Sequence, residues 1–348
     1  MIYRKKILLG LVLFVFMAGA LFSAYVYRSI FSSNTSFEDE SVAIYISTAA
    51  EPGRLSRALF PFLENTNTFL KVAKQKGYLA QVRGGKFIIK KGMSNNDIVN
   101  VLRSKPETVQ VSFNNVERLE NLAAKVSKLI EPDSTQLMNA FLDERFFLEN
   151  EFSKATALSM YIPNTYDFFW NTSADGFRDR MLKEYRIFWN EKRMQQAADI
   201  GLSPLEVSSL AAIVHKESVK KDERPRVAGV YLNRLKKNIK LQADPTVIFA
   251  LKHTQKDFNQ IINRVLYKDL KINSPYNTYK YKGLPPGPIF MADISAIDAV
   301  LYPEKHDFIF FVADTSRFGY HIFAKTLRQH NQNKRQYVRW LNERNISR

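Results

Sequence analysis

The chain of 348 residues contains no cysteine. This absence excludes disulfide bonds, metal sites built on thiolates, a cysteine nucleophile and a lipid-modified cysteine, and it leaves the redox compartment open. Hydrophobic residues make up 45% of the composition, so the chain can nevertheless bury a substantial core. Its length allows one large domain or two to three smaller ones.

Motifs of several enzyme classes are missing as well. No H-E-x-x-H occurs and the histidines are widely scattered, which argues against a zinc hydrolase. Residues 283–287 lack the Lys-Ser/Thr of a phosphate loop, and no G-x-S-x-G elbow is present. His215 and Glu217 have the H-x-E spacing of zinc deaminases, but the cysteine pair of such a site is absent. We therefore expect neither a metal nor a cofactor.

Acidic residues are few beside basic ones, and the formal net charge is +17. Such a charge attracts polyanions, which include nucleic acid, anionic lipid headgroups and acidic cell-wall polymers. Charge alone does not choose among these partners.

An apolar run at residues 7–26 is long enough to cross a bilayer as a helix. Basic residues precede it at positions 4–6, and acidic residues follow at positions 38–40, so we expect residues 1–6 to be a cytoplasmic tail and the bulk of the chain to lie outside. A cleaved signal peptide, with small residues at positions 18–20, is the alternative. An uncleaved anchor is favoured because the run is longer than a usual signal core, and an extracytoplasmic domain argues against nucleic acid as a partner.

After a polar tether at residues 27–40, the pattern predicts a small α+β module over residues 41–105. Its expected elements are a strand at 41–47, helices at 54–63 and 67–76, a strand at 86–90 and a helix from Ser94 to about 103. Its basic residues either contact an anionic polymer or form an ordinary solvated face.

The remainder, residues 106–348, is expected to be one mixed domain. We predict a strand at 109–113, a helix at 118–130 with more helix to about 155, a turn-rich aromatic loop at 161–170 and a charged helix at 177–196. Near the carboxyl end, an apolar run at 308–313 is suited to a buried strand, and a basic helix starts at Thr326.

In the central stretch, residues 203–238, one carboxylate, that of Glu217, falls on the apolar face of a predicted helix. Ser203, Pro204 and Glu206 form the capping box of a helix whose apolar face includes Leu210 and Ile213. Glu217 follows Ile213 by four residues, so it points along the same face and is partly desolvated. Desolvation and the negative helix end raise its pKa toward that of a general acid. The alternative is an ordinary ion pair with Lys220 or Lys221.

Other acids nearby are explained by helix starts. Asp222 or Glu223, with Pro225, begins a second helix that ends near Asn238, and Asp244 caps a third. Two loops, residues 274–279 and 283–287, are rich in turn formers and in groups that bind hydroxyls, as an extended polar ligand requires.

These residues together resemble a known family. Residues 212–218 (AIVHKES), 227–235 (VAGVYLNRL) and 241–248 (LQADPTVI), followed by 274–279 (SPYNTY), 283–289 (GLPPGPI) and 311–314 (FVAD), resemble the endolytic murein transglycosylases, the YceG-like or MltG family. The resemblance is strong over residues 200–340 and weak over the anchor and the small module. Several ordered motifs over such a span are more specific than any one of them.

The resemblance implies an α+β protein with a LysM-like module at residues 41–105 and a YceG-like catalytic domain at 106–348. It implies a lyase, single-pass in the cell inner membrane with its catalytic domain periplasmic, that cuts peptidoglycan glycan strands between MurNAc and GlcNAc and leaves 1,6-anhydroMurNAc ends. Such an enzyme would terminate nascent strands, with penicillin-binding synthases as partners.

The family's catalytic glutamate, the second acid of an E-K-E-[TS] motif, falls on Glu217. The first acid falls on His215, and the Glu-Gly that usually precedes the family's Pro-Asp-Thr-Tyr is replaced by Leu158 and Ser159. A lytic transglycosylase needs no water, so one carboxylate is enough for proton transfer in both directions. The expected substrate-binding residues are Gln242, Asp244, Tyr276, Asn277 and Thr278, for which loop structure is the alternative. Two other functions stay open: a weakly active glycan-binding anchor, and a water-using muramidase with Asp244 or Asp222 as second acid.

Overall fold

The computed structural model describes residues 2–344, and it is rich in helices with three two-stranded sheets. This mixture confirms the α+β class in its coarse form. The chain divides into two compact units. One holds the described residues up to Val111 with Lys128–Pro132 and Tyr166–Ser173, and the other holds Ser112–Ser127, Asp133–Thr165 and the residues from Ala174 onward.

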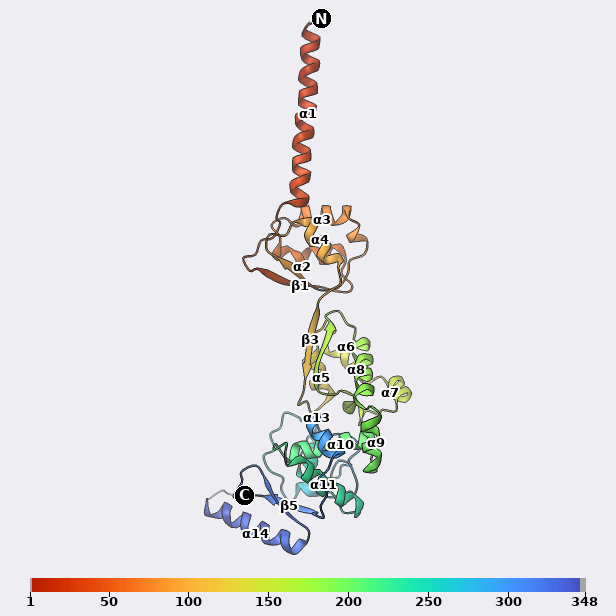
Figure 1. Cartoon of the computed structure of the whole chain (residues 1–348), viewed down its shortest axis with the longest axis vertical. Helices are drawn as coiled ribbons and strands as arrows, with labels where there is room; N and C mark the ends of the chain where they lie inside the picture. The colour runs from red at the N-terminus through yellow and green to blue at the C-terminus, as the bar shows by residue number, and fades with distance from the viewer. Residues whose placement is uncertain (1, 345–348) are drawn as a thin grey trace. The chain divides into compact units, whose positions relative to one another are not determined.

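The first unit begins with a long apolar helix, α1 (Ile2–Phe31), which is labelled at the red end of the chain in Figure 1. Residues 3–31 have a mean hydropathy of 2.6 within their most apolar window, and that window has no side chain buried inside the protein. A helix of this length and composition can cross a membrane, and a signal sequence has the same properties.

The small module follows α1 in the same unit. Strands β1 (Ser41–Ile46) and β2 (Gly85–Lys90) pair antiparallel, with Ile44 opposite Phe87. The helices of the module are α2 (Pro52–Leu59), α3 (Thr66–Gln75) and α4 (Asn95–Arg103), and 3-10 turns lie at Phe60–Phe62 and Tyr78–Ala80. All five predicted elements are therefore confirmed to within a few residues. A separate core of aliphatic and aromatic side chains lies between the sheet and the helices.

The stretch expected to be a tether is partly built into this module. Helix α1 continues to Phe31, and short β-bridges then join Ser33 to Ser94 and Thr35 to Leu63. The side chain of Asn34 is buried and donates to the Asn95 Oδ1 atom at 2.6 Å. The end of α1 is thus attached directly to the folded module.

The second unit contains short helices before its central core. These are α5 (Leu119–Val126), α6 (Ser134–Phe141), α7 (Glu144–Asn150), α8 (Ala174–Phe188) and α9 (Glu191–Asp199), with a 3-10 turn at Ala157–Met160. Two expectations for residues 106–199 were wrong. The aromatic segment forms strand β4 (Asn164–Phe169), which pairs with β3 (Thr108–Phe113), because Pro163 stands just before the strand and removes no ladder donor from it. The single helix expected at 177–196 is two, because Asn190 caps a new helix by accepting from the Arg193 N–H.

The core of the second unit surrounds α10 (Pro204–Glu217). This helix packs against α11 (Arg224–Lys236), α12 (Asp244–Gln255) and α13 (Ile294–Leu301), and a 3-10 turn lies at Asp269–Lys271. The predicted capping box of α10 is present, since Ser203 Oγ accepts from the Glu206 N–H and Glu206 accepts from the Ser203 N–H. Residues 207–214 are all buried, so α10 is the central helix of this core.

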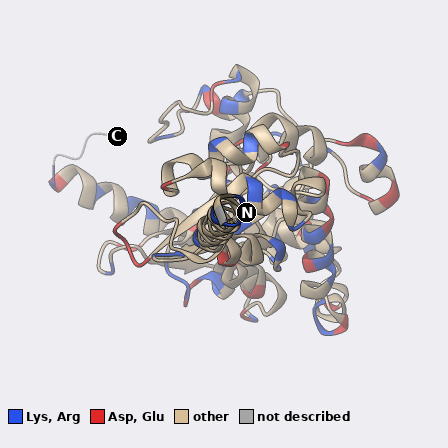
Figure 2. Cartoon of the chain, turned by 90° about the horizontal axis from the view of Figure 1, so that it is seen from above, with Lys and Arg blue, Asp and Glu red and all other residues tan. Residues whose placement is uncertain are grey.

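The carboxyl-terminal part adds a hairpin and a basic helix. Strands β5 (Phe310–Ala313) and β6 (His321–Ala324) pair antiparallel, and α14 (Leu327–Glu343) starts as predicted with Thr326 as its N-cap. The predicted strand is present, but its residues are half-buried rather than buried, because only one other strand pairs with it. In Figure 2 the Lys and Arg residues occur on many elements instead of one stripe, so the net charge of +17 is spread widely.

Candidate active site

Glu217 is the last residue of α10, and the backbone turns to an extended conformation at Ser218. Its side chain is half-buried, so it borders the core while solvent still reaches it. The Tyr231 hydroxyl on α11 donates to the Glu217 Oε1 atom at 2.9 Å, and Tyr231 is only 2% exposed. One carboxylate oxygen is therefore held by a rigid, buried partner.

The surroundings of Glu217 raise its pKa to about 7. Burial is the largest cause because it disfavours the charged carboxylate, and the negative charge of Asp244 acts in the same direction. The Tyr231 hydrogen bond and the charges of His321 and Arg234 oppose this rise. A carboxyl group with this pKa is divided between its acid and base forms at neutral pH, as a group that both donates and accepts a proton should be.

The alternative of a simple surface ion pair does not describe Glu217. Among the described residues, no salt bridge joins it to Lys220 or Lys221. The Lys220 ammonium lies 5.2 Å from the centroid of the Tyr320 ring instead. The partner of Glu217 is thus a neutral hydroxyl, which leaves the carboxyl group without a fixed counter-ion.

A second carboxylate belongs to the same cluster. Tyr279 donates its hydroxyl to Asp244 Oδ1 at 2.6 Å, and burial followed by this bond raises the pKa of Tyr279. Asp244 is exposed and is the first residue of α12, whose N-cap is Ala243. The prediction that Asp244 caps this helix was wrong, because its side chain accepts from the tyrosine instead of from the helix backbone.

Arg234 fixes the chain that enters α12. Its guanidinium donates to the carbonyl oxygens of Leu241 at 2.7 Å and Ile309 at 2.6 Å, and it is mostly buried. Gln242 follows Leu241 directly and is exposed. Its φ is positive at 52°, a left-handed conformation that costs energy for a residue with a side chain. The arginine therefore holds Gln242 and Asp244 in a defined loop beside α11.

A buried glutamate, Glu223, lies at the end of the turn that joins α10 to α11. Glu223 is 5% exposed, and its carboxylate accepts from the His321 N–H at 2.7 Å and from His321 Nδ1 at 2.8 Å. The Ser218 hydroxyl donates to the same carboxylate at 3.2 Å. The Glu223 carboxylate can only accept, so His321 Nδ1 carries the hydrogen of this bond. Glu223 is at the N-cap position of α11, as expected, but its side chain makes no cap bond to that helix and binds His321 and Ser218 instead.

Comparison with known proteins identifies the family. The model of the YceG-like family matches residues 45–336. The chain belongs to the YceG-like family. It is 31% identical over 300 residues to the endolytic murein transglycosylase of Bacillus subtilis, which covers 81% of this chain and 80% of the relative. It is 25% identical to the endolytic murein transglycosylase of Streptococcus pneumoniae strain R6 over 76% of this chain, but spans 52% of that protein's length. A crystal structure of a yceG-like protein from Listeria monocytogenes superposes with a TM-score of 0.55 and 25% identity, covering 85% of this chain and 99% of that one.

The YceG-like chain differs from the motif of its family at His215, and the structure shows where this residue points. His215 Nδ1 accepts from the Asp293 N–H at 3.1 Å, and its ring centroid lies 5.1 Å from that of Phe290. Burial lowers the pKa of His215. Burial alone would raise the pKa of Asp293, but bonds from Arg224 and Ser295 outweigh it and keep that pKa below its usual value. His215 therefore joins α10 to the start of α13.

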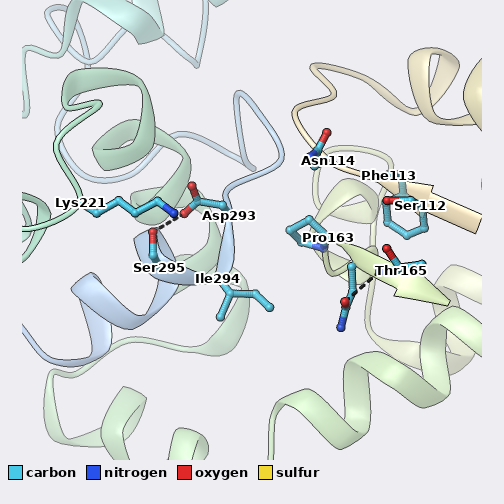
Figure 3. Close-up of a pocket in the computed structure, with 10 residues that line it drawn as sticks. Ser112, Phe113, Asn114, Pro163, Thr165, Lys221, Asp293, Ile294 and Ser295 are labelled. Atoms are coloured by element: carbon cyan, nitrogen blue, oxygen red, sulfur yellow. Dashed lines mark hydrogen bonds between the residues drawn. The ribbon is translucent and has the colours of Figure 1, made fainter.

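A cavity of about 360 Å³ lies next to this junction in the second unit. Figure 3 shows two groups that face each other across it: Lys221 with Asp293 and Ser295 on one side, and residues 112–114 with 163–165 on the other. The second group contains Asn164, whose amide carries no charge, so among the described residues the charged side chains that line the cavity are Lys221 and Asp293 on the first side.

The five expected substrate-binding residues are placed in two different ways. Gln242 and Asp244 are exposed beside the Glu217 cluster. Asn277 and Thr278 are buried, with the Asn277 amide donating to the Leu270 and Ile272 carbonyl oxygens. Thr278 bonds Thr246 and the Ala243 N–H, and Tyr276 packs against Phe249. The last three shape the loop, and substrate contact by any of the five stays a prediction.

Sequence reasoning missed Tyr231, Tyr279 and the Glu223–His321 pair. Tyr231 lies in the second predicted helix, and no local spacing connects it with Glu217. Glu223 and His321 are 98 positions apart. Their contact depends on the β5–β6 hairpin reaching the α10–α11 turn, which periodicity does not encode.

Proposed function

We propose that this chain cleaves peptidoglycan glycan strands internally as a lytic transglycosylase, with Glu217 as its acid and base. The named relatives support the reaction class, since two carry the name endolytic murein transglycosylase. The observation that carries the assignment of the site is the half-buried Glu217 with a pKa of about 7 and no fixed counter-ion among residues 2–344.

One carboxyl group performs both proton transfers. Protonated Glu217 donates to the glycosidic oxygen as the bond from the MurNAc anomeric carbon breaks, and GlcNAc leaves with that proton on its hydroxyl. The MurNAc 6-hydroxyl oxygen then attacks the anomeric carbon and loses its proton to the Glu217 carboxylate. The ring closes as a 1,6-anhydro sugar, no water is consumed and Glu217 returns to its acid form.

Tyr231 orients the catalytic group. Because its hydroxyl holds Oε1, the Oε2 atom is the one directed to substrate, which limits the rotation of the side chain during the cycle. Gln242 and Asp244, in the loop held by Arg234, are placed to bind sugar hydroxyls.

A water-using muramidase is the second candidate, and the proximity of Asp244 favours it. Two acids are usual in glycoside hydrolysis, and Asp244 is close enough to affect the charge state of Glu217. Asp222, the other acid considered, accepts from the Tyr320 hydroxyl at 3.0 Å. A reducing MurNAc end would be the product of hydrolysis, in place of the anhydro end.

The test is the digestion of isolated sacculi by the detergent-solubilised chain and by Glu217→Gln, with product ends identified by mass spectrometry. Glutamine keeps the shape and the hydrogen bond to Tyr231 but carries no transferable proton. We expect turnover to fall by about 10²–10⁴-fold, with folding and glycan binding retained. If the folded variant released anhydro ends as fast as the wild type, the assignment of Glu217 would be wrong.

We further propose that α1 is an uncleaved anchor that leaves the small module and the second unit outside the cytoplasm. The end of this helix is fixed to the module, because Asn95 donates to the Ser29 carbonyl oxygen at 2.8 Å and Ile30 packs against the module core. Both residues lie beyond the alternative cleavage site at residues 18–20, so the uncleaved form is favoured by the length of the apolar run, which exceeds that of a usual signal core. The likeness of the module to LysM, with glycan as its ligand, and a partnership with penicillin-binding synthases are also proposals.

A further inference from the structure

A polar cavity of about 400 Å³ lies in the first unit, between the end of α1 and the small module. Helix α1 contributes Tyr25, Arg28 and Ser29, and the module contributes Glu64, Asn65 and Thr68. None of these residues belongs to the Glu217 cluster, so the cavity is separate from the proposed active site.

The depth of the cavity follows from the anchor. At 1.5 Å per residue, the apolar run of residues 7–26 covers about 30 Å, the thickness of a bilayer's hydrocarbon core. Tyr25, half exposed at the end of this run, then lies at the interface where tyrosine is enriched, and Arg28 lies just beyond it. The cavity therefore opens at the level of the lipid headgroups.

Its two charged residues lie at different distances from the membrane. Arg28 is in the last turn of α1. Glu64 is farther along, because its N–H donates to the Asn34 carbonyl oxygen, three residues after the helix ends. Both side chains are exposed, and within residues 2–344 neither has an ion-pair partner. The cavity thus presents a free cation nearer to the bilayer and a free anion farther out.

A phosphoethanolamine headgroup has the complementary order of charges, with phosphate next to glycerol and ammonium outermost. We propose that this cavity binds the headgroup of a zwitterionic phospholipid, with Arg28 at the phosphate and Glu64 at the ammonium group. Ser29 and Thr68 add hydroxyl donors for the phosphate oxygens. An anionic headgroup without an amine would satisfy Arg28 but would lie close to the Glu64 carboxylate. This inference depends on α1 remaining attached as a membrane anchor.

The experiment uses the full chain in nanodiscs that contain equal amounts of phosphatidylethanolamine and phosphatidylglycerol. Native mass spectrometry after release from the disc measures which lipids the protein retains. We expect the wild type to retain phosphatidylethanolamine preferentially. Glu64→Gln should reduce that preference about two- to fivefold, the range for an exposed charge pair, whereas Arg28→Gln should reduce retention of both lipids. Arg28→Lys keeps the positive charge, so this variant should retain both lipids as the wild type does.

Two variants outside the cavity serve as matched controls. Asp39→Asn and Lys71→Gln remove exposed charges of the same unit and should leave the lipid ratio unchanged. Retention by the wild type without preference, or an equal change in Asp39→Asn and Glu64→Gln, would overturn the proposal. The same spectra give the intact mass of the chain. A mass lacking α1 would refute the anchor itself, while an intact chain without lipid preference would refute only the cavity assignment.

Discussion

Replacing Tyr231 by Phe removes the one hydrogen bond that the described structure gives to the Glu217 carboxyl group. That bond favours the ionised carboxylate and so lowers the pKa of Glu217, although burial outweighs it and the pKa is still raised to about 7 with the bond in place. Hydrogen bonds to charged groups contribute about 1.5–3 kcal/mol, and one pKa unit corresponds to about 1.4 kcal/mol. The protonated form of Glu217 also accepts this bond, though more weakly, so only part of that energy separates the two charge states. We therefore expect the pKa of Glu217 to rise by about one unit in Tyr231→Phe.

The sign of the effect on activity follows from the mechanism. The reaction starts from protonated Glu217, so activity falls as pH rises through its pKa. In Tyr231→Phe the protonated form persists to higher pH, and the alkaline limb of kcat/KM should move upward by about one unit. Initial rates of anhydro-end release across a pH series measure this shift.

Tyr279→Phe is the matched control, since it removes a tyrosine hydroxyl from the same cluster that contacts Asp244 and not Glu217. Its alkaline limb should stay near that of the wild type. Thermal unfolding of both variants shows whether either change loosens the fold. An unmoved or lowered limb in folded Tyr231→Phe would refute the claim that this bond sets the charge state of Glu217.

Two predictions concern the first unit. Deleting residues 41–103 while keeping α1 should lower binding to sacculi, as measured by co-sedimentation, because the proposed glycan-binding module is lost; unchanged binding would make it a spacer. A reporter active only outside the cytoplasm, fused after residue 40, should give signal in the membrane fraction, because basic residues 4–6 hold the amino end inside. Signal from a freely soluble product would instead show that α1 is cleaved.

Helix starts were predictable because their determinants are local. Ser94, Ser203 and Thr326 each accept a bond from a backbone N–H three residues later, so a short stretch of sequence contains the whole interaction. The same logic would have found Asn190, whose cap divides α8 from α9, but the continuous amphipathic pattern hid it. Strand β4 was missed because its stability depends on pairing with β3, about fifty residues away, while Pro163 and Asn164 suggested only a turn.

Within the candidate site, the position of Glu217 could be predicted from local helical spacing, whereas its partner on another helix could not. Glu217 shares a helix face with Leu210 and Ile213, so its position at the border of the core follows from helical spacing. Its partner Tyr231 lies on another helix. Asn277 shows the reverse error, since a polar loop residue suggests a ligand contact although its amide bonds the loop's own carbonyl oxygens.

Asp244 distinguishes the one-acid from the two-acid mechanism. Its charge raises the pKa of Glu217, so Asp244→Asn should lower that pKa and move the alkaline limb of kcat/KM downward. In the proposed mechanism Asp244 transfers no proton, so the Asp244→Asn variant still forms anhydro products. Its affinity for the substrate falls only because one contact to a sugar hydroxyl is lost. In a muramidase the same change removes the second acid and lowers turnover by about 10²–10⁴-fold. A folded Asp244→Asn variant that forms anhydro ends near the wild-type rate at pH below 7 would therefore establish that Glu217 acts alone, and a collapse of turnover at every pH would refute it.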